Sequence, residues 1–199
     1  MNFNILSRVD NICSINTAVA TINNLGIPKE DKLTYNFFKK FSKEWNVRRT
    51  LGKEEDFRKF IDDFNNDIYK DIKKVDSLKS ASELVRKFSE DRAITIKNGE
   101  RRRPLSAVSK IFHFYNPTHF YVYDNYASQA LNYSGGVDNI YEFFKKFDDA
   151  LKIHDEFLTK SISDYREING SIGINNEDIG ILKIRFLDVS LMKISGRNM

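Results

Sequence analysis

The chain has 199 residues, of which 32 are Lys or Arg and 28 are Asp or Glu, for a formal net charge of +4. Its 41% hydrophobic and 30% charged content is ordinary for a globular protein and excludes a wholly disordered chain. No apolar run reaches the roughly 18–20 residues that a membrane helix needs, so we expect no membrane partner. The first residues lack a basic start followed by an apolar block, and we therefore expect no secretory signal.

The single cysteine, Cys13, excludes an intramolecular disulfide and a cysteine-based metal cluster within one chain. Together with the missing export signal, this predicts a cytoplasmic protein, and the apolar neighbours of Cys13 predict that it is buried. His113, His119 and His154 are the only histidines, and their spacing does not resemble a metal-ligand set. We predict no metal and no cofactor.

The first half of the chain predicts amphipathic helices. Apolar residues recur at helical spacing over residues 10–24, 32–49 and 54–75. The last of these has its acids early and its lysines late, as the helix dipole favours. A further helix is predicted over residues 80–89, with Ser80 or Ser82 as its N-terminal cap.

Residues 94–97 are predicted to be a short strand or extended loop, and Asn98-Gly99 a tight turn. Pro104 is typical of the start of a helix, which is predicted to run over residues 105–115 and to stop at Asn116-Pro117.

After a short extended piece, Asp124 is predicted to open a helix through Leu131. Residues 137–158 are predicted to form one amphipathic helix. The last helix, over residues 177–195, is apolar enough to be central and largely buried.

These elements predict an all-α fold, a compact multi-helix domain. Residues 1–199 form either one helical unit or two helical subdomains with a cleft near residues 100–131. Sixteen Phe residues, many at helical spacings, indicate an aromatic core.

Two local clusters concentrate the positive charge. Residues 97–110 hold five cations and one anion, and residues 39–49 have the same balance. With Trp45 and several Phe and Tyr residues nearby, these clusters are compatible with a face that binds a polyanion. They are equally compatible with solvated helix ends and loops.

The segment from Arg101 to Leu131 combines the residues that can carry chemistry. Lys110 lies in the first turns of an otherwise largely apolar helix, and Asp124 stands at the start of the next helix, fourteen residues further on. A lysine that is partly desolvated by apolar neighbours loses proton affinity and becomes a usable nucleophile. A nearby carboxylate can stabilise positive charge on a sugar or activate water.

This order of features resembles the helix-hairpin-helix DNA glycosylase superfamily, in particular its 8-oxoguanine DNA glycosylase-like branch. In that superfamily a motif of the type L-P-G-V-G-x-K-T-A precedes a helix and P-V-D-T-H-V begins a later one. Here LSAVSK (residues 105–110) is similar to the first and YVYDNYA (residues 121–127) to the second. The resemblance covers about thirty residues.

The resemblance implies a DNA glycosylase/lyase that excises a damaged or modified base, within an all-helical fold that has a cleft between two subdomains. It implies Lys110 as the amine nucleophile and Asp124 as the catalytic carboxylate. DNA is the expected partner, and aromatic residues near the pair could stack on an extruded base. The residues expected to contact DNA are Arg101, Arg102, Arg103, Ser106, Ser109, Tyr123 and Tyr126.

Structural roles for the same two residues stay open from the sequence alone. Asp124 is well suited to cap the helix that follows it, and Lys110 could extend out of an apolar helix to reach solvent. The alternative function is therefore a non-catalytic helical module that binds nucleic acid or protein.

Overall fold

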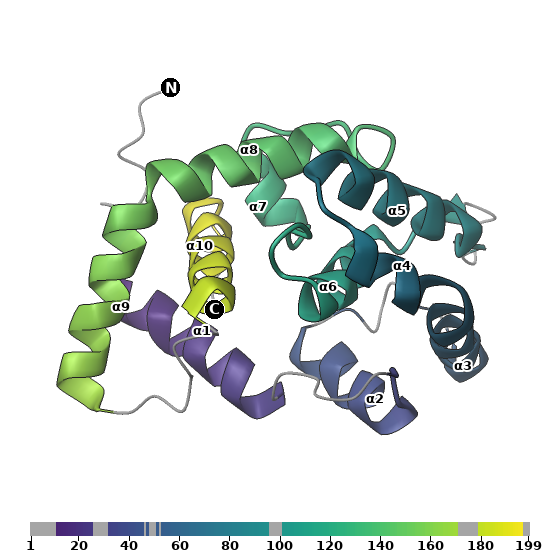
Figure 1. Ribbon diagram of the computed structural model, residues 1–199, viewed down its shortest axis with the longest axis horizontal. Coiled ribbons are helices and arrows are strands. Elements are labelled where there is room, and N and C mark those ends of the chain that lie inside the picture. The colour runs from purple at the N-terminus through teal and green to yellow at the C-terminus, as the bar shows by residue number, and fades with distance from the viewer. Residues whose placement is uncertain are drawn as a thin grey trace.

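The computed structural model describes residues 11–25, 32–45, 47, 51, 53–95, 101–170 and 179–196 (Figure 1). In this part of the chain helices dominate, and the only strands form one two-stranded ladder. The all-helical class predicted from the sequence is confirmed at that level.

The chain enters through α1 (Asn11–Leu25) and α2 (Tyr35–Glu44). The prediction of one helix over residues 32–49 is too long at both ends. Thr34 is in an extended conformation and its side chain accepts the backbone N–H of Phe37, so the helix starts after it. Trp45 caps the other end of α2.

The predicted helix over residues 54–75 is three joined segments, α3 (Glu54–Asp63), the π-helical η3 (Phe64–Ile68) and α4 (Tyr69–Lys74). Within η3, the Asn65 amide accepts a hydrogen bond from the Leu33 N–H at 2.8 Å and donates one to the Leu33 C=O at 2.9 Å. These two bonds attach Leu33, just before α2, to the π-helical segment. Hydrophobic periodicity alone could not predict the π-helical segment.

Helix α5 (Leu78–Asp91) starts earlier than predicted, because Ser77 rather than Ser80 or Ser82 is its cap and accepts the Ser80 N–H. Strand β1 (Ile94–Thr95) then pairs antiparallel with β2 (Arg101–Arg102). The predicted turn at Asn98-Gly99 lies outside the described residues.

Helix α6 (Leu105–Tyr115) has the predicted bounds, and α7 (Asn125–Ala130) begins directly after Asp124. The prediction of one helix over residues 137–158 is wrong. The structure has α8 (Ile140–Ile153) and α9 (Asp155–Asn169), which meet at His154, a residue that caps both helices.

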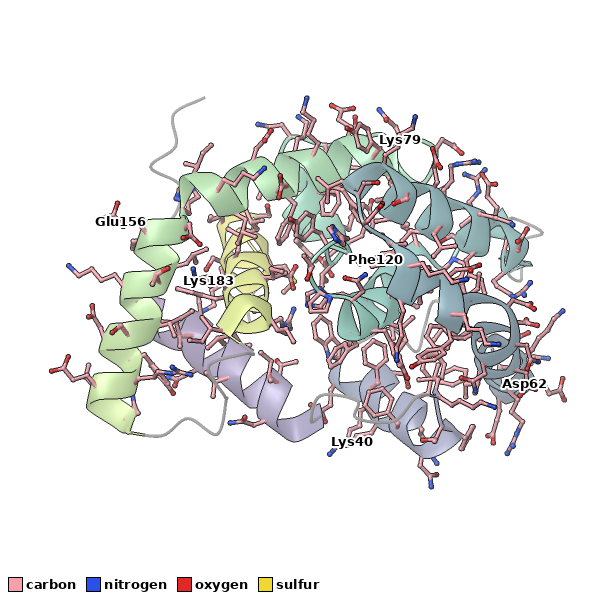
Figure 2. The ribbon with its side chains drawn as sticks, in the orientation of Figure 1. Lys40, Asp62, Lys79, Phe120, Glu156 and Lys183 are labelled. Atoms are coloured by element: carbon pink, nitrogen blue, oxygen red, sulfur yellow. The ribbon has the colours of Figure 1, made fainter. Side chains whose placement is uncertain are left out.

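The last described helix, α10 (Ile179–Ile194), lies in the interior as predicted and packs against α1 and α7 (Figure 1). Helix α5 packs against α6 and α8. Phe120 lies inside, whereas Lys40, Asp62 and Glu156 point outward (Figure 2). The prediction that Cys13 is buried is wrong, because its side chain is only partly covered.

None of the described helices is long and apolar enough to cross a membrane. The division into two subdomains with a cleft near residues 100–131 stays a prediction.

Candidate functional site

Helix α6 places Lys110 inside the protein rather than at its surface. The residue is 5% exposed, and its helix neighbours Ala107, Val108 and Ile111 are fully buried. Its ammonium Nζ lies 3.5 Å from Oδ2 of Asp124. The two residues singled out from the sequence therefore meet, and they do so in a setting where solvent screens their interaction little.

Asp124 has a structural role as well as this ion pair. Its Oδ1 accepts the backbone N–H of Tyr126 at 3.0 Å, which caps the first turn of α7. The N-terminus of a helix favours negative charge, and the Lys110 ammonium favours it further. Asp124 is 8% exposed, and its negative charge is stabilised by the N-terminus of α7 and by the Lys110 ammonium.

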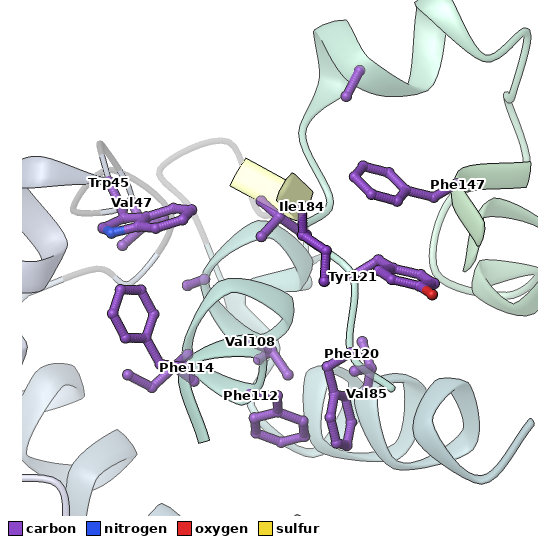
Figure 3. Close-up of a cluster of buried hydrophobic side chains, with 14 of the residues drawn as sticks. Trp45, Val47, Val85, Val108, Phe112, Phe114, Phe120, Tyr121, Phe147 and Ile184 are labelled. Carbon is purple, nitrogen blue, oxygen red and sulfur yellow. The ribbon is translucent and has the colours of Figure 1, made fainter. Parts of the chain in front are cut away.

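Trp45 covers the lysine from the end of α2. The Lys110 ammonium donates a hydrogen bond to the Trp45 carbonyl at 3.2 Å, and lies 5.9 Å from the centre of the indole. The indole packs on the rings of Phe41 and Phe114, with centroids 5.8 Å and 5.2 Å away. Figure 3 shows Trp45 above Phe114, with Val47 beside it.

Helix α10 adds two charged residues that were not predicted from the sequence as site residues. Arg185 is 7% exposed and Asp188 is fully buried, and they form an ion pair one helical turn apart. The Arg185 guanidinium lies over the Trp45 indole, 4.2 Å from its centre. Opposite charges three residues apart in an otherwise apolar helix were the available sequence signal.

The charges of Lys110 and Asp124 act on Asp188, and this links the Arg185–Asp188 pair to the Lys110–Asp124 pair. Burial raises the pKa of Asp188 to about 6, and the negative charge of Asp124 acts in the same direction. The cations Arg185 and Lys110 oppose this rise in pKa. The other three charged groups thus all act on Asp188. We call these four buried residues the charge cluster: Lys110, Asp124, Arg185 and Asp188.

His113 borders this cluster and is uncharged. Its Nδ1 lies 2.7 Å from the Phe120 carbonyl, which can only accept, so Nδ1 carries the proton. Burial lowers the pKa of His113 to about 4, and the Arg185 charge lowers it further, against the opposing effect of the Phe120 hydrogen bond. His113 therefore brings no positive charge to the cluster near neutral pH.

The arginines and serines predicted to contact DNA differ in their exposure. The backbone of Arg101 and Arg102 forms β2, but their side chains lie outside the described residues. Arg103 is exposed and its guanidinium pairs with Asp138 at 2.7 Å. Ser106 is half-buried, whereas Ser109 is fully buried.

Ser109 has an internal role that replaces the predicted DNA contact. Its hydroxyl accepts the backbone N–H of Tyr123 at 3.0 Å and donates to the Ser106 carbonyl at 3.3 Å. A hydroxyl with no exposed surface that is bonded in this way cannot reach a phosphate. It fixes the extended piece before Asp124 against α6, and so helps to hold Asp124 beside Lys110.

The tyrosines predicted to contact DNA differ in accessibility. Tyr126 is 39% exposed at the start of α7. Tyr123 is half-buried and packs edge-on against Phe143, with ring centroids 5.1 Å apart. Tyr121 is buried against Phe147 (Figure 3) and its hydroxyl donates to Asp148 at 2.6 Å, which makes it part of the core.

The basic cluster of residues 39–49 is only partly described. Lys39, Lys40 and Lys43 are exposed on α2, and Arg48 and Arg49 lie outside the described residues. In the described part of the chain, no three His, Cys, Asp or Glu side chains are grouped so that they could hold a metal ion.

A lysine beside a carboxylate has defined chemical capabilities. The carboxylate can accept the ammonium proton, and the freed amine can attack an electrophilic carbon of a sugar or aldehyde. Both groups are buried and Trp45 contacts the Lys110 ammonium, so a substrate would have to displace Trp45 to reach the amine. No known protein family, curated protein or solved structure matches this chain.

Proposed function

We propose that this protein binds DNA and acts as a DNA glycosylase/lyase on a damaged or modified base. The observation that carries the proposal is the 3.5 Å separation between the Lys110 ammonium and the Asp124 carboxylate. The two residues come from separate elements, α6 and the cap of α7, and the sequence resemblance implies the same two as nucleophile and carboxylate.

The chemistry follows from the pair. Asp124 accepts the proton of the Lys110 ammonium, and the free amine attacks C1′ of the deoxyribose. The C1′–N bond breaks, its electron pair leaves with the base, and the base takes up the proton held by Asp124. The Asp124 carboxylate formed in this way stabilises the positive charge on the sugar and the attached amine. The C1′–O4′ bond then breaks with its electron pair on O4′, one proton passes from the amine to O4′ through Asp124, and a protonated imine remains between Lys110 and C1′.

The nucleotide must reach the buried Lys110 amine. The extruded nucleotide enters where Trp45 covers the lysine, so the end of α2 has to move when DNA binds. The exposed lysines of α2 and the exposed Arg103 supply charge for the phosphates. Tyr126 offers an exposed ring at the start of α7.

Borohydride trapping tests the amine without knowledge of the excised base, because an abasic site presents the sugar aldehyde directly. We expect the wild-type protein to form a covalent complex with a duplex that contains one abasic site. Lys110→Arg keeps the charge but cannot form the imine, so trapping should be lost. Asp124→Asn should slow trapping by about 10²–10⁴-fold, the usual contribution of a proton-transfer group.

Lys79→Ala is the control, since Lys79 is an exposed lysine on α5. It should trap at the wild-type rate. Trapping that persists in Lys110→Arg would show that surface amines form the imine, and the catalytic proposal would then be wrong.

The burial of the pair favours a second candidate, a helical module that binds nucleic acid without catalysis. Side-chain exposures of 6% for Lys110 and 11% for Asp124 suit residues that hold α6, α7 and Trp45 together. In this case DNA is retained at low salt and released as salt rises, with no trapping.

Arg103→Ala separates DNA binding from chemistry. We expect it to weaken binding to all duplex sequences alike and to reduce the slope of log K against log salt by about 0.9, the loss of one phosphate contact. Filter binding or fluorescence anisotropy at several salt concentrations measures both. Asp138→Asn, which removes only the ion-pair partner of Arg103, should not weaken binding. A chain that retains no DNA at low salt would instead favour a protein-binding adaptor.

A further inference from the structure

Arg185 and Asp188 are the charged residues of the cluster to which the proposed chemistry assigns no part. Both are buried within the apolar helix α10. Among the described residues, Arg185 Nε, Asp188 Oδ1 and the indole Nε1 of Trp45 are buried without a hydrogen-bond partner. Buried polar atoms of this kind destabilise a fold, and a packed apolar pair would avoid the cost. A role in the site accounts for their presence.

The contacts form a continuous path from α10 to the lysine. Asp188 pairs with Arg185, the Arg185 guanidinium lies 4.2 Å from the centre of the Trp45 indole, and the Trp45 carbonyl accepts from the Lys110 ammonium at 3.2 Å. A guanidinium is attracted to the face of an indole, and a carboxylate bonded to the guanidinium weakens that attraction by partly neutralising its charge.

We propose that Arg185 and Asp188 are positioning residues of this site, in which Arg185 holds Trp45 over Lys110 and the charge on Asp188 sets the strength of that hold. The part of the inference that concerns catalysis rests on the proposed function. The part that concerns Trp45 does not.

In the described part of the chain, few charged groups surround Asp188. Lys110 of α6 and Asp124 at the start of α7 act on it from outside its helix, and Arg185 from within. Helix α1 has no charged residue. Helix α9 also packs on α10, and its Asp155 pairs with Lys183 of α10. Helix α8 packs on α10 as well, and its Asp148 and Glu142 pair with Lys152 and Lys146 of the same helix. His113 of α6, with a pKa of about 4, faces Arg185 and stays neutral near pH 6.

Trp45 is the only tryptophan in the chain, so the indole N–H gives a single, self-assigned cross-peak in a ¹⁵N–¹H spectrum. With a pKa of about 6, Asp188 becomes negative as the pH rises through that value. We expect the indole cross-peak of the folded wild-type protein to shift between pH 5 and 7.5 with one midpoint near 6. In Asp188→Asn this transition should be absent.

Asp155→Asn is the matched control, because Asp155 also pairs with a cation of α10 but at an exposed position. It should keep the wild-type transition. A wild-type indole signal that does not change over this range, or an equal transition in Asp188→Asn, overturns the proposal.

A second measurement covers the case in which Asp188→Asn does not fold. In wild-type protein labelled with ¹³C at the aspartate carboxyls, one carboxyl should titrate with the same midpoint as the indole cross-peak. If no aspartate carboxyl shares that midpoint, the proposal fails.

The part of the inference that concerns catalysis is tested by the pH dependence of borohydride trapping on abasic DNA. Removal of the Asp188 charge leaves the Lys110 ammonium with one carboxylate fewer to stabilise it, so the amine forms at lower pH. The rate profile of Asp188→Asn should move toward lower pH relative to the wild-type and Asp155→Asn profiles, and an unmoved profile contradicts the positioning role. Loss of trapping in all proteins, with the indole transition intact, would contradict the proposed function alone.

Discussion

Replacing Phe112 by alanine is expected to lower the free energy of unfolding by about 3–5 kcal/mol, the usual cost of removing a large ring from a packed core. Phe112 is fully buried on α6 and lies near Phe120 (Figure 3). Its ring centroid is 5.3 Å from that of Phe120 and 5.6 Å from that of Phe88. These partners come from α5 and from the segment before Asp124. The substitution thus leaves a cavity between α6 and the elements that hold it.

Denaturant unfolding followed by circular dichroism measures this loss. A domain has only about 5–15 kcal/mol of stability in total, so the variant is expected to be close to unfolding. Phe157→Ala is the control, because Phe157 is only partly buried on α9 and its ring centroid is 6.5 Å from that of Phe186, its one ring contact within the described ranges. Equal losses in the two variants would contradict the packing described for α6.

Lys110→Met is expected to destabilise the protein by about 3–5 kcal/mol, because it leaves buried carboxylates without their ammonium. Oδ2 of Asp124 is 3.5 Å from Nζ of Lys110, and the positive charge of Lys110 also stabilises the Asp188 carboxylate. Adding Asp124→Asn to Lys110→Met removes one unpaired carboxylate and should restore part of the stability. A double-mutant cycle over the four proteins gives the coupling energy of the pair.

Lys74→Met is the matched control for burial. Lys74 pairs with Asp71 at 3.9 Å, but the two side chains are 77% and 55% exposed, and such pairs contribute about 0–1 kcal/mol. If Lys110→Met is as stable as Lys74→Met, the Lys110 amine is not held as a charged partner of Asp124.

The part of the site that lies within one short segment could be predicted from the sequence. Pro104 before an apolar helix, and Asp124 before a second one, gave the bounds of α6 and the start of α7. The capping role of Asp124, left open from the sequence, is present in the structure together with its ion pair to Lys110.

The rest of the site required the tertiary structure. The sequence places Trp45 beside a basic cluster, and nothing local indicates that its carbonyl meets a lysine 65 residues away in sequence. The spacing of Arg185 and Asp188 in a helix predicted to be buried indicates an ion pair, but not that the pair meets Trp45. The junction of α8 and α9 at His154 was missed because no glycine or proline marks it.

The central place of α10 bears on how the chain acquires its structure during synthesis. Its main neighbour, α1, is made first among the described helices, and α10 is made last. At translation rates of about 5–20 residues per second, α1 waits on the order of 10 s for this partner. Until then Lys110 and Asp124 lack the charges of Arg185 and Asp188. Ribosome-bound chains that stop before α10 should therefore expose apolar surface and require chaperones.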